Sequence, residues 1–112
     1  MELRHLRYFI AVAEELHFGR AAQLLGISQP PLSQQIQALE QELGARLFER
    51  TNRRVALSEA GRLFLDEARL VLAQVDKASD VARRAQLGEL GELKIGFTTS
   101  APFTSSIPQA IF

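Results

Sequence analysis

The sequence predicts a mainly α-helical protein with a small β-hairpin and a long final helix. Three observations support this fold class. Apolar residues recur every three or four positions over residues 3–16, 19–25, 28–44 and 59–87, glycines follow several of these stretches, and two short strand-like runs flank a polar turn within residues 47–57. The 112 residues suffice for one domain with a modest core.

The composition excludes several functional classes. Hydrophobic residues make up 46% and charged residues 23% of the chain, as is usual for a soluble globular protein. There is no cysteine, so disulfides, thiolate metal sites and cysteine nucleophiles are excluded. Charged residues interrupt the first 16 positions, which argues against a signal peptide, and no apolar run reaches transmembrane length. We therefore expect a cytoplasmic protein with no membrane partner.

The charge balance is zero, with 13 basic and 13 acidic residues. This argues mildly against a nucleic-acid partner, because neutralising phosphates requires local positive charge. The distribution weakens that objection. Four arginines fall within nine positions, opposed there only by Glu49, and they are Arg46, Arg50, Arg53 and Arg54. A neutral protein can still present one basic edge.

The first three predicted helices form a compact arrangement. The first covers residues 3–16, and the second covers residues 19–25 and ends at Gly26, where a positive φ costs glycine little. The third runs from Ser28, a good N-cap, to Gly44 in the C′ position. Its prolines at positions 30 and 31 fit only in a first helical turn. Two helices joined by such a tight turn form a helix-turn-helix.

The third helix has a polar outer face with no carboxylate in its first half. Its core stripe consists of Leu32, Ile36, Leu39 and Leu43. At about 100° per residue, the side chains roughly 100° to 200° away from Leu32 point outward. They belong to Pro30, Ser33, Gln34 and Gln37. Gln29 and Pro31 stand at the protruding start of the helix.

These residue types suit a helix that lies in the major groove of DNA. Glutamine can bond to both adenine N6 and N7, and serine can reach either kind of base edge. Pro30 and Pro31 offer an apolar surface to a thymine methyl group. Backbone N–H groups in the first turn can bind a phosphate.

A hairpin is predicted next, from strands at residues 47–50 and 54–57 and a turn at residues 51–53. A hairpin placed after a helix-turn-helix is called a wing, so the sequence predicts a winged helix-turn-helix. The tip carries Arg53, with Arg50 and Arg54 near the flanks. Arginines there are expected to reach the DNA backbone or the minor groove.

The fourth helix is expected to mediate dimerisation. Ser58 caps it, Glu59 suits its positive N-terminal end, and it continues to about residue 87. At about 1.5 Å per residue it spans roughly 45 Å, too long for this domain to cover. Small and apolar residues alternate at spacings of four and three, which predicts a seam with a partner helix. They are Phe64, Ala68, Val71, Val75, Ala78, Ala82 and Ala85.

Residues 92–100 are expected to form a single strand, which cannot satisfy its edges alone. We therefore interpret the chain as the front part of a longer protein with three segments. Residues 1–58 form the winged helix-turn-helix, residues 59–88 form the linker helix, and residues 89–112 begin a C-terminal α/β domain.

The chain strongly resembles the N-terminal region of LysR-type transcriptional regulators. The matching pieces are the stretch from LRHLRYF through GARLFER, then LSEAG and the long helix, and GELKIGF resembles the first strand of the family's effector-binding domain. The resemblance implies a winged helix-turn-helix that binds operator DNA as a homodimer through the linker helices. It assigns direct DNA contacts to Gln29, Pro30, Pro31, Ser33, Gln34, Gln37 and Arg53.

In full-length members of that family a small molecule binds between two lobes of the C-terminal domain, and we expect a tetramer there. The resemblance places effector-binding hydroxyls at Thr98, Thr99 and Ser100. Two departures matter. Many relatives have arginine at Gln34, and many have serine or threonine at Gly19, so a cap and a phosphate contact are lost there. Arg20 is a candidate to supply that phosphate contact.

The sequence leaves two alternatives to a DNA-binding regulator. A winged helix can instead dock on protein, in which case no salt-dependent DNA affinity is expected. An enzyme is disfavoured, because His5 and His17, the only histidines, belong to no catalytic or metal-ligand pattern. His17 lies at the end of the first predicted helix, where a cation is favoured. No cofactor and no metal are expected.

Overall fold

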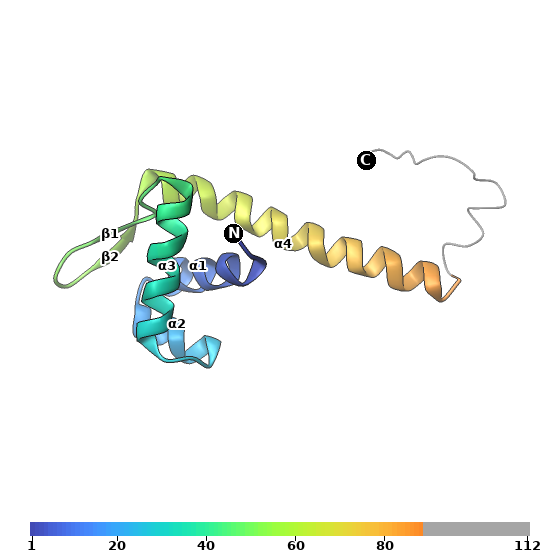
Figure 1. The fold of residues 1–112 in the computed structure, drawn as a ribbon, viewed down its shortest axis with the longest axis horizontal. Helices are drawn as coiled ribbons and strands as arrows, with labels where there is room; N and C mark the ends of the chain where they lie inside the picture. Colours follow the sequence, from blue (N-terminus) through green and yellow to red (C-terminus); the bar gives the residue numbers. More distant parts are fainter. Residues whose placement is uncertain (89–112) are drawn as a thin grey trace. The chain divides into compact units, whose positions relative to one another are not determined.

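A computed structural model describes residues 1–88 and contains the predicted elements in the predicted order (Figure 1). They are α1 (Leu3–Glu15), α2 (Phe18–Leu25), α3 (Gln29–Leu43), β1 (Phe48–Arg50), β2 (Val55–Leu57) and α4 (Glu59–Gln86). This mainly helical architecture with one antiparallel hairpin confirms the predicted fold class. The strand expected over residues 92–100 lies outside the described residues.

The chain divides into two compact units, and the first is Met1–Ala73. It includes the first half of α4, because Phe64, Leu65 and Leu72 of that helix pack against the core of α1 to α3. The second unit begins at Gln74. Within residues 74–88 every side chain is exposed except that of Val75. The three segments predicted from the sequence remain predictions about domain organisation.

An aromatic cluster forms the centre of the first unit. The Phe9 and Phe48 ring centroids lie 5.4 Å apart, and those of Phe9 and Phe64 lie 5.1 Å apart. Phe18 packs edge-on against Phe48, at 6.0 Å between ring centroids. These contacts bring together α1, α2, β1 and α4. No polar or charged residue is buried in the described part of the chain, so hydrophobic packing is the main source of stability here.

The turn between α2 and α3 follows the predicted chemistry. Gly26 adopts the left-handed conformation with φ of 72°, and its N–H group donates to carbonyl oxygens of the last turn of α2. Gly44 ends α3 in the same way, with φ of 68°. At the start of α4 the Ser58 hydroxyl accepts a hydrogen bond from the Gly61 N–H group at 2.9 Å, which confirms the predicted cap.

The hairpin is short and closed by a polar turn. β1 and β2 pair antiparallel in the register Phe48 with Leu57 and Arg50 with Val55. The Thr51 N–H group donates to the Arg54 carbonyl oxygen at 2.9 Å. The Thr51 hydroxyl accepts a hydrogen bond from the Arg54 N–H group at 3.1 Å. The sequence pattern predicted that Arg54 begins the second strand. In the structure Arg54 belongs to the turn, and β2 begins at Val55.

None of the helices described here combines the length and the hydrophobicity that a membrane crossing requires. Within residues 1–88, no group of three or more His, Cys, Asp or Glu side chains is placed to hold a metal ion.

Candidate nucleic-acid interface

The outward face of α3 lies where the helical period places it. Its core stripe is almost fully covered, with Leu32 and Ile36 0% exposed and Leu39 1% exposed. The opposite side is open to solvent and comprises Gln29, Pro30, Pro31, Gln34 and Gln37, with Ser33 half-buried. The first turn of α3 contains no acidic residue. An uncharged polar face of this kind can approach an anionic surface without repulsion.

Ser28 is the N-cap of α3, as predicted, but its side chain makes no capping hydrogen bond. The reason is the absence of the N–H groups that would donate to it. An N-cap hydroxyl accepts from the N–H groups two or three positions later, and both of those positions here are prolines. The Ser28 hydroxyl is thus left available at the exposed end of the helix. The same prolines correct the expectation that several N–H groups of this turn can bind a phosphate, since Pro30 and Pro31 have none.

The start of α2 differs from the expectation. His17 is not the end of α1 but the N-cap of α2, and its Nδ1 accepts a hydrogen bond from the Arg20 N–H group at 3.0 Å. The prediction that His17 lies at the end of the first helix was therefore wrong. A Cβ atom added at Gly19 would lie 3.0 Å from His17 Cε1. The absence of a side chain at Gly19 therefore leaves space for the His17 ring, and His17 caps α2 where the serine or threonine expected at position 19 is missing.

Arg20 is turned toward the end of α1. Its Nε lies 3.4 Å from Glu15 Oε1, and its terminal nitrogen donates to the Glu15 carbonyl oxygen at 3.3 Å. Both side chains are substantially exposed, so this ion pair contributes less than about 1 kcal/mol. A phosphate contact by Arg20 remains a prediction, and it requires Arg20 to leave Glu15.

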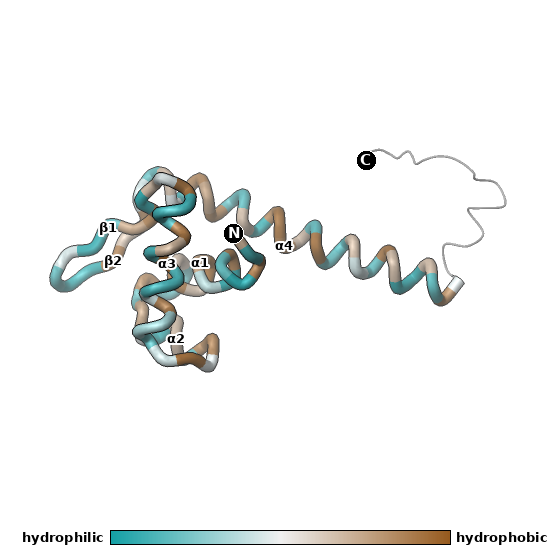
Figure 2. Tube along the Cα trace, viewed as in Figure 1, coloured by the Kyte–Doolittle hydropathy of each residue, from teal (hydrophilic) through white to brown (hydrophobic). Residues whose placement is uncertain are grey.

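Within residues 1–88, the four arginines of the basic edge form no ion pair with an acidic side chain. Arg46, Arg50, Arg53 and Arg54 are all exposed, and among the ion pairs within residues 1–88 none involves them. The hairpin tip is predominantly hydrophilic (Figure 2). The local positive charge inferred from the sequence is therefore not paired with a carboxylate in the described part of the chain.

The hairpin turn and the start of α3 share one hollow. A cavity of about 290 Å³ is lined by the α1–α2 junction, by Gln29 and by the turn that carries Arg53 and Arg54. Three residues that the sequence predicts as DNA contacts thus meet at one place. His17 and Gly19 line the same cavity. Helix N-terminus, amide and guanidinium groups all act there as hydrogen-bond donors, which suits an anionic ligand.

Arg50 lies elsewhere. Its Cζ atom is 4.5 Å from the centroid of the Phe18 ring, and it lines a second cavity together with Gln37. Successive side chains of a strand alternate between faces, so Arg50 shares the face of buried Phe48 and Glu49 takes the other. The sequence placed Arg50 on the flank of the wing, and the structure turns it toward α2 and α3.

The predicted dimer seam on α4 is shorter than expected. Ala68 is 1% exposed and belongs to the core of the first unit, and Phe64 packs against Phe9. Both were predicted to face a partner helix, but their own domain covers them. The remaining positions of the seam are Val71, Val75, Ala78, Ala82 and Ala85. Val71 is 42% exposed.

Sequence reasoning missed the structural contacts of three residues near this candidate interface. They are His17, Thr51 and Glu40. The hydroxyl of Thr51 orders the hairpin turn, and a Ser or Thr that bonds the backbone two or three residues on is a known turn signal. The carboxylate of Glu40 holds the start of β1 through two backbone N–H groups. No sequence signal identifies that last contact, because its partners are seven and eight residues away.

The comparisons with known proteins agree with this geometry. The sequence model described as bacterial regulatory helix-turn-helix protein, lysR family, matches residues 3–62. The chain is 63% identical over 111 residues to the uncharacterized HTH-type transcriptional regulator YnfL of Escherichia coli (strain K12), covering 99% of this chain and 37% of that protein. It is 55% identical over 103 residues to the HTH-type transcriptional regulator AlsR of Bacillus subtilis (strain 168), covering 92% of this chain and 34% of that protein. The chain thus spans about a third of the length of these curated relatives.

Solved structures give the same result. The crystal structure of the BenM_DBD/benA site 1 DNA complex is 50% identical and has a TM-score of 0.74, covering 77% of this chain and 97% of that chain. The CbnR_DBD–DNA complex is 46% identical with a TM-score of 0.75, covering 77% of this chain and 99% of that chain. By its helix-turn-helix, its wing and its sequence, the protein belongs to the LysR family of bacterial regulatory helix-turn-helix proteins.

Proposed function

We propose that this chain binds double-stranded DNA sequence-specifically and thereby regulates transcription. α3 lies in the major groove with Ser33, Gln34 and Gln37 toward the base edges, and the hairpin turn contacts the adjoining backbone or minor groove. One observation carries the proposal: an exposed polar face without carboxylates in the first half of α3 stands beside four arginines that form no ion pair within residues 1–88. The DNA complexes of its structural relatives support the same reading.

A double substitution tests this proposal. Gln34→Ala with Arg53→Ala removes one predicted base contact and one predicted backbone contact. We expect weaker binding to the preferred fragment, by about 1–3 kcal/mol for the base contact, and a salt dependence reduced by about one charge. Fluorescence anisotropy at several salt concentrations measures both. A control with Gln74→Ala and Arg62→Ala removes the same side chains from α4. Unaltered affinity and salt slope in the first variant would overturn the proposal and favour a protein-docking winged helix.

We further propose that the DNA-binding form is a homodimer through α4. Exposed Val71, half-buried Val75 and the exposed alanines at 78, 82 and 85 continue at heptad spacing. A dimer places two copies of α3 about 34 Å apart, in successive major grooves. Selection of bound DNA from a random library then yields a palindrome. A monomer in sedimentation at high micromolar concentration, or a single non-palindromic half-site, contradicts the dimer.

In a longer protein of the relatives' size, regulation by a small-molecule effector and assembly to a tetramer are part of this proposal. The effector contacts expected at Thr98, Thr99 and Ser100 lie outside the described residues. A cytoplasmic, nucleoid-associated location follows from the same proposal. Regulators of this family are not enzymes, and we propose no catalytic role.

A further inference from the structure

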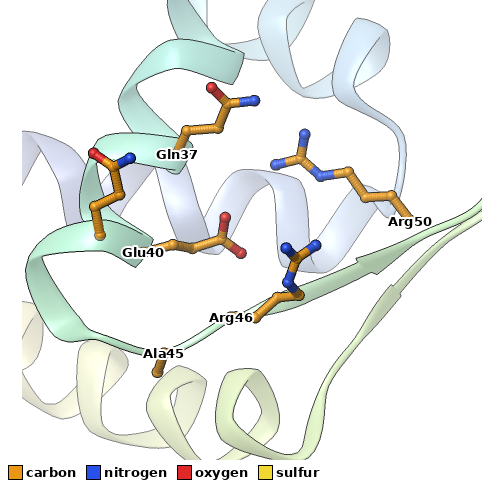
Figure 3. Close-up of a pocket in the computed structure, with 6 residues that line it drawn as sticks. Gln37, Glu40, Ala45, Arg46 and Arg50 are labelled. Atoms are coloured by element: carbon orange, nitrogen blue, oxygen red, sulfur yellow. The ribbon is translucent and has the colours of Figure 1, made fainter.

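A second hollow lies beside the exposed face of α3. It has a volume of about 370 Å³ and is lined by Gln37, Glu40 and Gln41 of α3, Ala45 and Arg46 of the following segment, and Arg50 of β1. Figure 3 shows the side chains of Gln37, Glu40, Arg46 and Arg50 directed toward this common space. Two guanidinium groups and one carboxylate therefore meet there, and the carboxylate decides what the site can bind.

The Glu40 carboxylate is engaged with the backbone. Its Oε2 accepts hydrogen bonds from the N–H groups of Leu47 at 2.8 Å and Phe48 at 3.2 Å. It forms no ion pair with Arg46 or Arg50, and neither arginine pairs with any other carboxylate of the described chain. The hollow thus presents two positive side chains, and its one acidic lining residue, Glu40, already accepts two backbone hydrogen bonds.

Both arginines extend from fixed points. The Arg50 guanidinium stacks over the ring of Phe18, 4.5 Å from its centroid, and Phe18 is only 7% exposed. The peptide group that follows Arg46 is held at both of its polar atoms, because the Arg46 carbonyl oxygen accepts from the Ser58 hydroxyl at 2.6 Å and the Leu47 N–H group donates to Glu40. Such pre-ordering lowers the entropic cost of binding a ligand.

We propose that Arg46 and Arg50 hold a phosphate of the DNA backbone at the edge of the groove that α3 enters. The inference rests on the proposed function. A phosphodiester offers only acceptor oxygens, which match the fork of N–H donors on arginine. Gln37 belongs both to the outward face of α3 and to this hollow, so the site is continuous with the base-reading surface. Arg46 thereby gains a specific contact beyond its membership of the basic edge.

The test is Arg46→Gln in the full chain, measured against a preferred and an unrelated DNA fragment. Arg46 is the sharper choice, because Arg50→Gln also removes the contact with Phe18. The hydrogen bonds around position 46 involve only its backbone and survive the change. We expect binding to both fragments to weaken by about tenfold, with the salt slope reduced by about one charge. Arg46→Lys keeps the charge and should retain most of the slope.

Arg62→Gln is the matched control, since Arg62 is an exposed arginine that pairs with Glu59. It should leave affinity and slope unchanged. A thermal melt shows whether each variant is folded. If the unaltered chain has no salt-dependent affinity for DNA, the proposed function fails and this inference fails with it. If the unaltered chain binds, a folded Arg46→Gln variant with an unchanged slope overturns this inference alone. Loss confined to the preferred fragment also overturns it, because that result indicates a base contact.

Discussion

The arginines of residues 46–54 and those in the first half of α4 have the same side chain but differ in whether they form ion pairs. On α4, Arg62 lies 2.6 Å from a Glu59 carboxylate oxygen and Arg69 lies 3.0 Å from one of Glu14. On the basic edge, none of the four arginines has an acidic partner in the described structure. The protein has zero net charge, yet the charge of one edge remains available to a ligand. Net charge therefore says little about nucleic-acid binding, whereas local pairing says much.

Secondary structure accounts for the difference. A helix brings side chains three and four positions apart together, and Glu59 and Arg62 use that spacing. A strand sends neighbouring side chains to opposite faces. Glu49, the only acid within residues 46–54, therefore points away from the face of Arg50. The alternation of side chains along β1 thus keeps Arg50 away from Glu49.

The largest effect should come from the contact that seats this hairpin. A Cβ atom at Gly61 would lie 2.0 Å from the carbonyl oxygen of Leu47. A backbone oxygen cannot move aside as a side chain can, so Gly61→Ala must separate α4 from the start of β1. We expect a loss of about 2 kcal/mol in the free energy of unfolding despite the better helix propensity of alanine. Urea denaturation measures this loss, and weaker DNA binding should accompany it.

Gly19→Ala is the matched control for that change. It makes the same substitution in a helix, but the new methyl group meets the movable ring of His17, 3.0 Å away. We expect a change within about 1 kcal/mol. Equal stability of Gly61→Ala and the unaltered chain would show that the hairpin is not seated on α4 in this way, and the comparison of the two arginine sets would lose its structural basis.

Periodicity predicted the helices and the exposed face of α3 correctly, because those features depend on local spacing. It could not tell which neighbour covers an apolar stripe. Phe64 and Ala68 continue the heptad of α4, yet Phe64 packs against Phe9 and Ala68 is buried in the core of the first unit. The apolar spacing along a helix is the same whether a partner helix or the core of its own domain covers those residues.

The sequence also did not predict the hydrogen bonds between separate segments. The contacts of Glu40 with β1 and of Ser58 with Arg46 join residues 7 to 12 positions apart, and no propensity encodes them. The Ser28 cap failed for a reason that the sequence did contain, since two prolines remove the N–H groups it would need. The contact residues assigned to DNA and to the dimer remain predictions.

A smaller effect on DNA affinity is expected from an arginine added on α3, beside the basic edge. Gln34 is exposed on α3, and no carboxylate stands three or four positions from it. Gln34→Arg should therefore add an unpaired charge at the proposed groove. We expect the salt slope for an unrelated DNA fragment to increase by about one charge, with tighter non-specific binding. The same anisotropy titration measures both.

Its control is Ala73→Arg, on the side of α4 away from the seam. Asp76 stands three positions later, so the new charge gains a helical partner. We expect no change in salt slope from this variant. If both variants raise the slope equally, total charge and not the basic edge governs binding.

The smallest effect concerns the pair that keeps Arg62 occupied. A hydrogen bond from Arg62, together with its charge, lowers the pKa of Glu59. A carboxyl group with a lowered folded-state pKa stabilises the fold above its ordinary pKa, and that contribution is lost as pH falls through the lowered value. Glu59→Gln should therefore be slightly less stable than the unaltered chain at neutral pH, and the difference should vanish in acid. Thermal melts across that pH range measure it, with Glu67→Gln, an exposed carboxylate without an ion pair in residues 1–88, as the matched change. A difference that persists at low pH would mean that Glu59 acts by packing, and Arg62 would then no longer be an example of a charge satisfied within the protein.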